Sequence, residues 1–149
     1  MKGIVTLLCS LLLLSSCYKE QKSADTLKGT WSVNRIQWAN GNDIAIDGDS
    51  HRIEFLPCEQ AYTATCTGVY FLDYADTLRP DLRDTFRFEI KGDEFSVSQI
   101  KSSVPSNTIV TRILRQRYRI ESLEDAAFTF KRIKTNVDSA SGLITASKQ

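Results

Sequence analysis

Polar and apolar residues alternate along most of the chain between Leu27 and Lys134, and the period of an amphipathic helix is absent there. In the clearest stretch, Phe86, Phe88 and Ile90 alternate with polar residues, as is typical of a strand that buries one face. The pattern predicts seven strands and one brief strand, joined by turn-forming residues: Thr30–Ala39, Ile44–Ile46 (the brief one), His51–Pro57, Thr63–Asp73, Thr85–Ile90, Glu94–Ile100, Thr108–Glu121 and Ala127–Ile133.

Thr30–Ala39 changes phase along its length. Trp31 and Val33 would share one face, whereas Ile36 and Trp38 would share the other. The change predicts a bulge near Asn34. Short strands with turns between them favour an antiparallel sandwich or an up-and-down barrel, and a barrel of about eight strands encloses room for its own side chains or one small ligand.

The chain begins with a different kind of segment. After Met1 and Lys2, residues 4–14 form an uncharged run, shorter than the roughly 20 apolar residues that a membrane span requires. Residues 1–16 are therefore predicted to be a signal peptide. The polar residues 17–26 are predicted to be a tether and residues 135–149 a flexible tail, which leaves residues 27–134 as the folded domain.

The end of the signal peptide, Leu14-Ser15-Ser16-Cys17, resembles the lipobox of bacterial lipoproteins. The resemblance implies that cleavage leaves Cys17 as the first mature residue, anchored by several acyl chains such as palmitate. The alternative is an ordinary signal peptide with an incidental cysteine. No Asp follows Cys17, and Lys19-Glu20 half matches the surface-export signal of Bacteroidetes lipoproteins. The expected location is the outer membrane, on either its periplasmic or its surface face.

Charge and composition exclude several classes of protein. The chain carries 19 Lys and Arg against 18 Asp and Glu, and the signal peptide removes one of the basic residues. A neutral mature chain argues against a nucleic-acid partner. With one His, no clustered cysteines and no phosphate-binding loop, nucleophile elbow or HExxH motif, we expect neither a metal, a cofactor nor an enzyme.

The chain has four cysteines. Cys9 leaves with the signal peptide and Cys17 is the lipidation site, so Cys58 and Cys66 remain in an oxidising compartment. They lie on the two sides of a predicted hairpin and are expected to form a structural disulfide rather than a redox or metal pair. If the two cysteines face each other, the paired residues are Phe55 with Val69 and Ile53 with Phe71.

The segment Leu27-Lys28-Gly29-Thr30-Trp31 resembles the Gly-x-Trp start of the lipocalins, in which the Trp closes one end of the barrel. Together with the lipobox and a last strand pair at residues 118–123 and 128–130, it resembles the small lipocalin-like lipoproteins of Bacteroidetes over residues 27–134. The Thr-Asp-Tyr triplet and the terminal amphipathic helix of lipocalins are absent. The resemblance implies an all-β, antiparallel, up-and-down lipocalin-like barrel of about eight strands.

Four side chains are candidates for contact with a small hydrophobic ligand: Trp31, Arg112, Gln116 and Tyr118. The last three would share one face of the strand Thr108–Glu121, where a few polar groups among apolar ones could orient a ligand. The alternative is that these polar groups hydrogen bond to one another or lie near a rim of the barrel.

Other polar residues have simpler interpretations. Arg115, Arg117 and Arg119 could contact anionic groups, but a solvated face balanced by acidic neighbours is favoured. His51 stands alone as a possible acid or base. Three aspartates are expected in turns rather than in a calcium site: Asp43, Asp47 and Asp49. Four others are expected in a solvated loop: Asp73, Asp76, Asp81 and Asp84.

Two functions remain open. The first is a lipid-anchored envelope protein that binds a small hydrophobic molecule non-covalently in its barrel. The second is a structural or interaction protein that contacts another envelope protein and whose barrel is filled by its own side chains. A lumen of about 300 Å³ or more would favour the first. Solid packing by five phenylalanines would favour the second: Phe55, Phe86, Phe88, Phe128 and Phe130.

Overall fold

The computed structural model describes residues 20–38, 43–45, 50–58, 65–74, 81–104, 109–114, 117–133 and 141–149. The predictions for the signal peptide, Cys17 and Gln116 lie outside these ranges. Residues 20–27 are helical. The other elements are β1 (Gly29–Trp38), β2 (Asp43–Ala45), β3 (His51–Phe55), β4 (Thr65–Leu72), β5 (Leu82–Lys91), β6 (Glu94–Lys101), α2 (Ile109–Leu114), β7 (Arg117–Leu123), β8 (Ala127–Arg132) and β9 (Ser141–Lys148).

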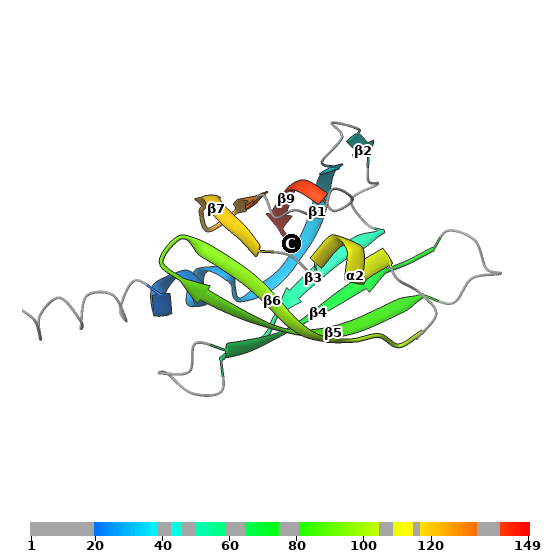
Figure 1. Ribbon diagram of the computed structural model, residues 1–149, viewed down its shortest axis with the longest axis horizontal. Helices are drawn as coiled ribbons and strands as arrows, with labels where there is room; N and C mark the ends of the chain where they lie inside the picture. The colour runs from blue at the N-terminus through cyan, green and yellow to red at the C-terminus, as the bar shows by residue number, and fades with distance from the viewer. Residues whose placement is uncertain are drawn as a thin grey trace, which may run out of the picture.

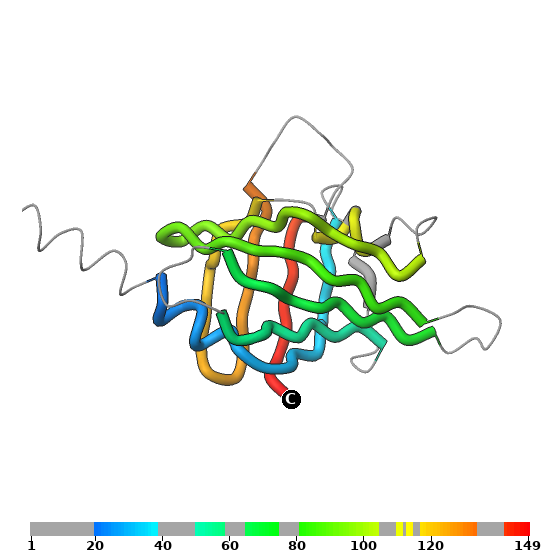
Figure 2. The backbone as a smooth tube through the Cα atoms, turned by 90° about the horizontal axis from the view of Figure 1, so that it is seen from below, coloured from blue at the N-terminus to red at the C-terminus, as the bar shows by residue number. Residues whose placement is uncertain are grey.

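Eight antiparallel strands form a closed barrel, in the order β1-β3-β4-β5-β6-β7-β8-β9 and back to β1. The short β2 pairs with residues 35–37 of β1, beyond the part of β1 that pairs with β3. Figure 1 shows β3 to β6 on one side of the barrel, and Figure 2 shows the remaining strands crossing them. The predicted all-β, up-and-down architecture is confirmed, because each strand pairs with its neighbour in sequence around the ring.

The strands bury the residues that the alternation indicates. Phe86, Phe88, Ile90, Phe128 and Phe130 are all 4 % exposed or less and belong to one hydrophobic core. The predicted bulge in β1 is also confirmed, since the register with β9 shifts between Val33 and Arg35. The shift turns Trp31, Val33 and Ile36 all inward.

The prediction of a flexible tail over residues 135–149 is wrong for residues 141–149. These residues contain β9, which pairs with β1 on one side and β8 on the other and so closes the barrel. Ile144 and Ala146 point into the core. The segment is rich in Ser and Thr, and only two neighbouring strands, supplied by the tertiary fold, satisfy its backbone groups.

The β3–β4 hairpin is shifted by one residue from the predicted register. Phe55 lies opposite Gly68 and Ile53 opposite Tyr70, rather than opposite Val69 and Phe71. Tyr70 therefore points inward and is fully buried, whereas the Phe71 ring points outward. A one-residue shift exchanges the two faces of a strand. Gly68 suits this register, because the ring of Phe86 from β5 occupies the space where a side chain at residue 68 would lie.

Two further predictions change. Residues 20–26 were expected to be a tether, but they belong to a helix that packs Leu27 and Ala24 against the core. Thr108–Glu121 was expected to be one strand, but it contains α2 and then β7. In α2, Val110, Ile113 and Leu114 are buried at helical spacing, and this spacing competes with the period-two pattern in a segment this short.

Candidate functional site

The barrel has two unlike ends. The Trp31 end contains helical residues 20–27, the start of β1 and the β5–β6 and β7–β8 turns (Figures 1 and 2). The α2 end contains α2, the end of β1, the start of β5 and residues 102–104.

Trp31 closes its end of the barrel. The indole is fully buried, its Nε1 donates a hydrogen bond to the Leu27 carbonyl at 2.5 Å, and its ring meets Phe128 edge-on with 5.1 Å between centroids. Lys148 covers the indole, with Nζ 5.2 Å from the ring centre. All these contacts are with the protein itself. Because its side chain has no exposed surface, Trp31 closes the barrel, and the structure gives no support to its predicted contact with a ligand.

Aromatic rings fill the interior next to Trp31. Phe128 stacks on Phe130 with 4.4 Å between centroids, and Phe130 stacks on Phe95 at 4.5 Å. Phe55 meets the rings of Phe88 and Phe128 edge-on at 5.2 and 6.1 Å. These spacings are those of rings in van der Waals contact. The five phenylalanines singled out as the possible filling of the lumen do fill this part of it, so a ligand would have to lie toward the α2 end.

Polar groups enter the interior at the α2 end. Tyr70 is fully buried, and its hydroxyl is hydrogen bonded to Nδ1 of the half-buried His51 at 2.7 Å. Burial, and to a lesser extent the neighbouring Tyr118 hydroxyl, raises the pKa of Tyr70 far above its ordinary value. Burial also lowers the pKa of His51. The pair is therefore a neutral phenol and a neutral imidazole at physiological pH, suited to hydrogen bonding rather than to holding charge.

Asp84 is the buried carboxylate of this end. The sequence suggested a solvated loop, but Asp84 is 0 % exposed and lies directly across the sheet from Tyr70. Its Oδ1 accepts hydrogen bonds at 2.9 Å from the Ser102 hydroxyl and from the Ser103 backbone N–H. Its Oδ2 has no hydrogen-bond partner among the residues that the structure describes. The sequence carried a signal for this burial, because Asp84 continues the inward phase of Phe86, Phe88 and Ile90 on β5.

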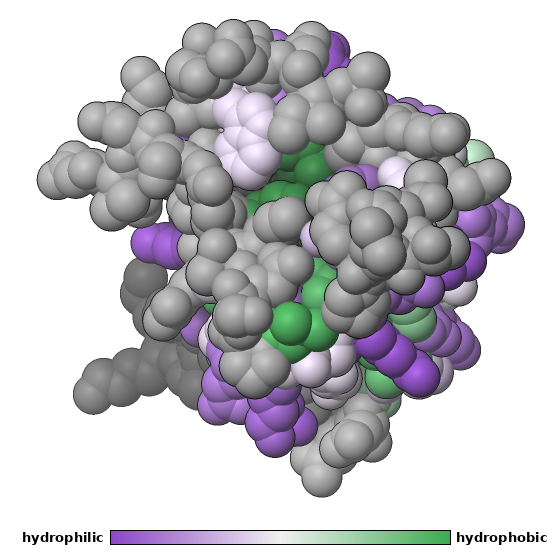
Figure 3. All heavy atoms as spheres, turned by 90° about the vertical axis from the view of Figure 1, so that its right-hand side faces the viewer, coloured by the Kyte–Doolittle hydropathy of each residue, from purple (hydrophilic) through white to green (hydrophobic). Residues whose placement is uncertain are grey.

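The six-residue helix α2 lies at the same end of the barrel (Figure 1). Its buried face packs on the barrel, and the buried Tyr118 hydroxyl donates a hydrogen bond to the Ile113 carbonyl. Trp38, Tyr74 and Val104 are only partly buried and pack against the core. Figure 3 looks onto the side of the molecule toward which α2 lies, and green atoms of apolar side chains are visible there between other atoms.

Of the predicted ligand contacts, only Tyr118 can be placed here through its side chain. Arg112 belongs to α2, but its side chain, like Gln116, lies outside what the structure describes. The expected single strand face that would carry all three is absent, because α2 interrupts it. The sequence pattern did not indicate that His51, Tyr70 and Asp84 lie at the same end. They do so because of the one-residue register shift and the burial of Asp84, neither of which the pattern predicted.

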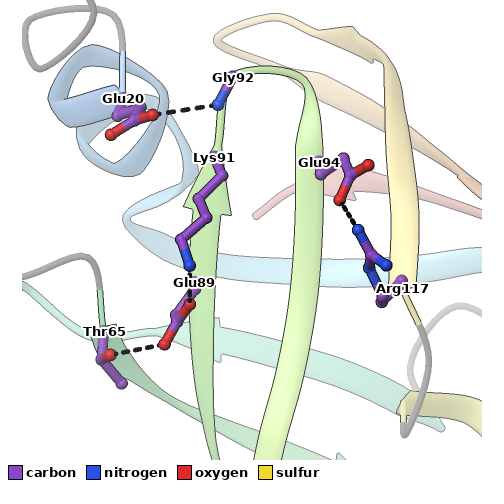
Figure 4. A network of polar contacts seen from close by, with 7 residues as sticks. All are labelled: Glu20, Thr65, Glu89, Lys91, Gly92, Glu94 and Arg117. Carbon is purple, nitrogen blue, oxygen red and sulfur yellow. Dashed lines mark hydrogen bonds and ion pairs between the residues drawn. The ribbon is translucent and has the colours of Figure 1, made fainter.

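The other sequence-based candidates have structural roles. Cys58 and Cys66 form the predicted disulfide. Arg117 and Arg119 are exposed and pair with Glu94 and Asp93, the former shown in Figure 4. This confirms the solvated, charge-balanced face for these two residues, whereas Arg115 lies outside the described ranges. The side chain of Asp43, and both Asp47 and Asp49, also lie outside them.

Within the described ranges, no three His, Cys, Asp or Glu side chains lie close enough together to hold a metal ion. No helix in these ranges combines the length and the apolar character needed to cross a membrane.

The strand order and closure define a lipocalin-like barrel. The crystal structure of a lipocalin-like protein from Bacteroides uniformis superposes on it with a TM-score of 0.57, covering 83 % of this chain and 98 % of that chain at 16 % sequence identity. At this identity the likeness concerns the fold. Searches of protein-family models and of curated proteins found no match.

Proposed function

We propose that this protein is a non-catalytic bacterial lipoprotein, anchored in the outer membrane through Cys17, whose barrel binds a small, largely hydrophobic molecule without a covalent bond. The lipobox-like segment supports the anchor. The lipocalin-like fold supports ligand binding. The aromatic packing near Trp31 supports a site at the α2 end.

One observation carries the binding proposal. The interior is filled by rings near Trp31, whereas the α2 end contains the buried Tyr70 and the buried Asp84, whose Oδ2 has no hydrogen-bond partner within the described part of the chain. Ligand sites are mostly apolar with a few polar groups that fix orientation. A ligand with an apolar body and one hydrogen-bond donor matches this combination, because Asp84 Oδ2 can accept that hydrogen bond.

The two tryptophans of the chain test the position of the site, because Trp31 lies near the start of β1 and Trp38 is its last residue, toward the α2 end. A long-chain alcohol brominated along its chain has an apolar body and one hydroxyl donor, and its bromines quench tryptophan only on contact. We expect it to quench the wild-type emission in part and to have no effect on Trp38→Phe, which retains only Trp31. Quenching that persists in Trp38→Phe would contradict a site at the α2 end.

The anchor has a separate test. Cys17→Ala should give an unlipidated protein that leaves the membrane fraction, with Cys9→Ala as the control because Cys9 lies within the signal peptide. Retention of Cys17→Ala in the membrane, or an unmodified Cys17 in the mature wild type by mass spectrometry, would contradict lipidation.

The aromatic packing also favours a second function, that of an envelope interaction protein without a small-molecule ligand. Native mass spectrometry of the mature protein from its own host separates the two. A reproducible added mass that is lost on denaturation supports the carrier. A repeatedly ligand-free spectrum, together with no quenching by the brominated alcohol, supports the interaction protein.

A further inference from the structure

Helical residues 20–27 are docked on the barrel, although the sequence indicated a tether there. Leu27 is fully buried, its carbonyl accepts the Trp31 indole N–H, and Ala24 packs against the core. At the other end of the helix, the Glu20 carboxylate accepts a hydrogen bond from the Gly92 backbone N–H at 3.2 Å, as Figure 4 shows. The helix is therefore fixed at both ends to the Trp31 end of the barrel.

This docking shortens the connection to the lipid anchor. Only Tyr18 and Lys19 separate Cys17 from the docked Glu20. Three Cα–Cα steps of 3.8 Å span at most about 11 Å. A free tether from Cys17 to Thr26 would instead have left the barrel able to turn in any direction.

The groups around the docked helix suit a bilayer surface. A groove of about 360 Å³ lies here, lined by Gln21, Lys22, Asp25, Thr26, Asp125 and Lys148. The lining contains two cations and two carboxylates. Zwitterionic headgroups, which carry one charge of each sign, can meet such a surface without net repulsion.

We infer that the Trp31 end of the barrel rests on the membrane surface and that the α2 end points away from it. The inference rests on the lipid anchor of the proposed function, but not on ligand binding. It has a consequence for exchange, because a molecule bound at the α2 end would enter from the aqueous side rather than directly from the bilayer.

Two exposed positions on one strand measure the orientation. Asp93 precedes β6 at the Trp31 end, and Lys101 ends β6 near the α2 end. Eight residues of strand separate them by about 26 Å, or about 20 Å along the axis of a tilted barrel. In the mature lipidated protein Cys17 is acylated and Cys58 is bonded to Cys66, so Asp93→Cys and Lys101→Cys each provide one free thiol for a fluorophore.

The labelled, lipidated proteins are placed in vesicles of phosphatidylethanolamine and phosphatidylglycerol whose headgroups carry a nitroxide quencher. We expect quenching at residue 93 to be several-fold stronger than at residue 101. A matched variant carries a 20-residue Gly-Ser insertion between Lys19 and Glu20, which adds a root-mean-square length of about 25 Å. This variant should still float with the vesicles while the difference between the two labels shrinks.

The outcomes separate the inference from the anchor. Protein that floats with the vesicles but is quenched equally at both positions, or more at residue 101, overturns the orientation and leaves the anchor intact. Protein that does not float, with Cys17 unmodified by mass spectrometry, overturns both. An insertion variant that keeps the full difference also overturns the inference, because the short connection would then not set the orientation.

Discussion

Gly68 gives the sharpest test of the barrel interior. It lies on β4 opposite Phe55, where the register differs from the one that the sequence suggests. A methyl group at this position would come within 2.3 Å of the Phe86 ring, far inside van der Waals contact. Phe86 is itself fully buried and meets the rings of Phe55 and Phe88, so it has little freedom to move away.

We expect Gly68→Ala to lower the free energy of unfolding by about 3 kcal/mol, the upper part of the range for overpacking a core. Gly92→Ala is the matched control. Gly92 has φ of 63° in the β5–β6 turn and nothing within 4 Å of an added methyl, so only the left-handed backbone opposes the change. That strain costs about 1 kcal/mol.

Urea unfolding followed by circular dichroism measures both variants. The double variant Gly68→Ala/Phe86→Leu should lose less free energy of unfolding than the two single variants lose in sum, because the smaller Leu side chain makes room for the methyl group. A Gly68→Ala protein as stable as the wild type, or no less stable than Gly92→Ala, would refute the packing and register at β4.

Three other changes test the closure, the crosslink and the buried pair. Deleting residues 141–149 should abolish cooperative thermal unfolding, because β1 and β8 lose a shared partner strand; a cooperative transition in the truncated protein would show that β9 is dispensable. Replacing Cys58 and Cys66 by Ala should lower the free energy of unfolding in urea by about 2.5 kcal/mol, the chain-entropy value for a bond spanning a sequence separation of 8; no change would contradict this contribution. Burial lowers the pKa of His51, so the unfolded chain takes up this proton first, and stability should be full above about pH 6.5 and decrease as the pH falls below it. His51→Gln should flatten the profile between pH 7 and 5 in the same unfolding assay, and an unchanged slope would place the titration elsewhere.

The sequence predicted most of the walls of the barrel. Strict alternation in β5 and in β8 fixed which side chains point inward, since the side-chain period of a strand is two and only one face of these strands is apolar. The phase change in β1 likewise predicted the bulge. The cysteine pair could be predicted because two cysteines beside one hairpin need little chain between them to meet.

Three features needed the tertiary structure. The register of the β3–β4 hairpin turns Gly68 inward, where the ring of Phe86 from β5 fills the space beside it. The position of Asp84 depends on Ser102 and Ser103, which supply the hydrogen bonds that its burial requires. The helical state of residues 20–27 depends on the Trp31 and Gly92 contacts that fix its two ends.

The sequence by itself therefore determined the fold class, the inward residues of the most regular strands and the disulfide, all of which follow from local patterns. Only the tertiary structure decided that β9 closes the barrel, that rings fill the Trp31 end, and that His51, Tyr70 and Asp84 meet at the other end. The physical reason is common to these features. A polar strand or a buried polar group is stable only with partners far away in the sequence, and the local pattern does not show which partners the fold supplies.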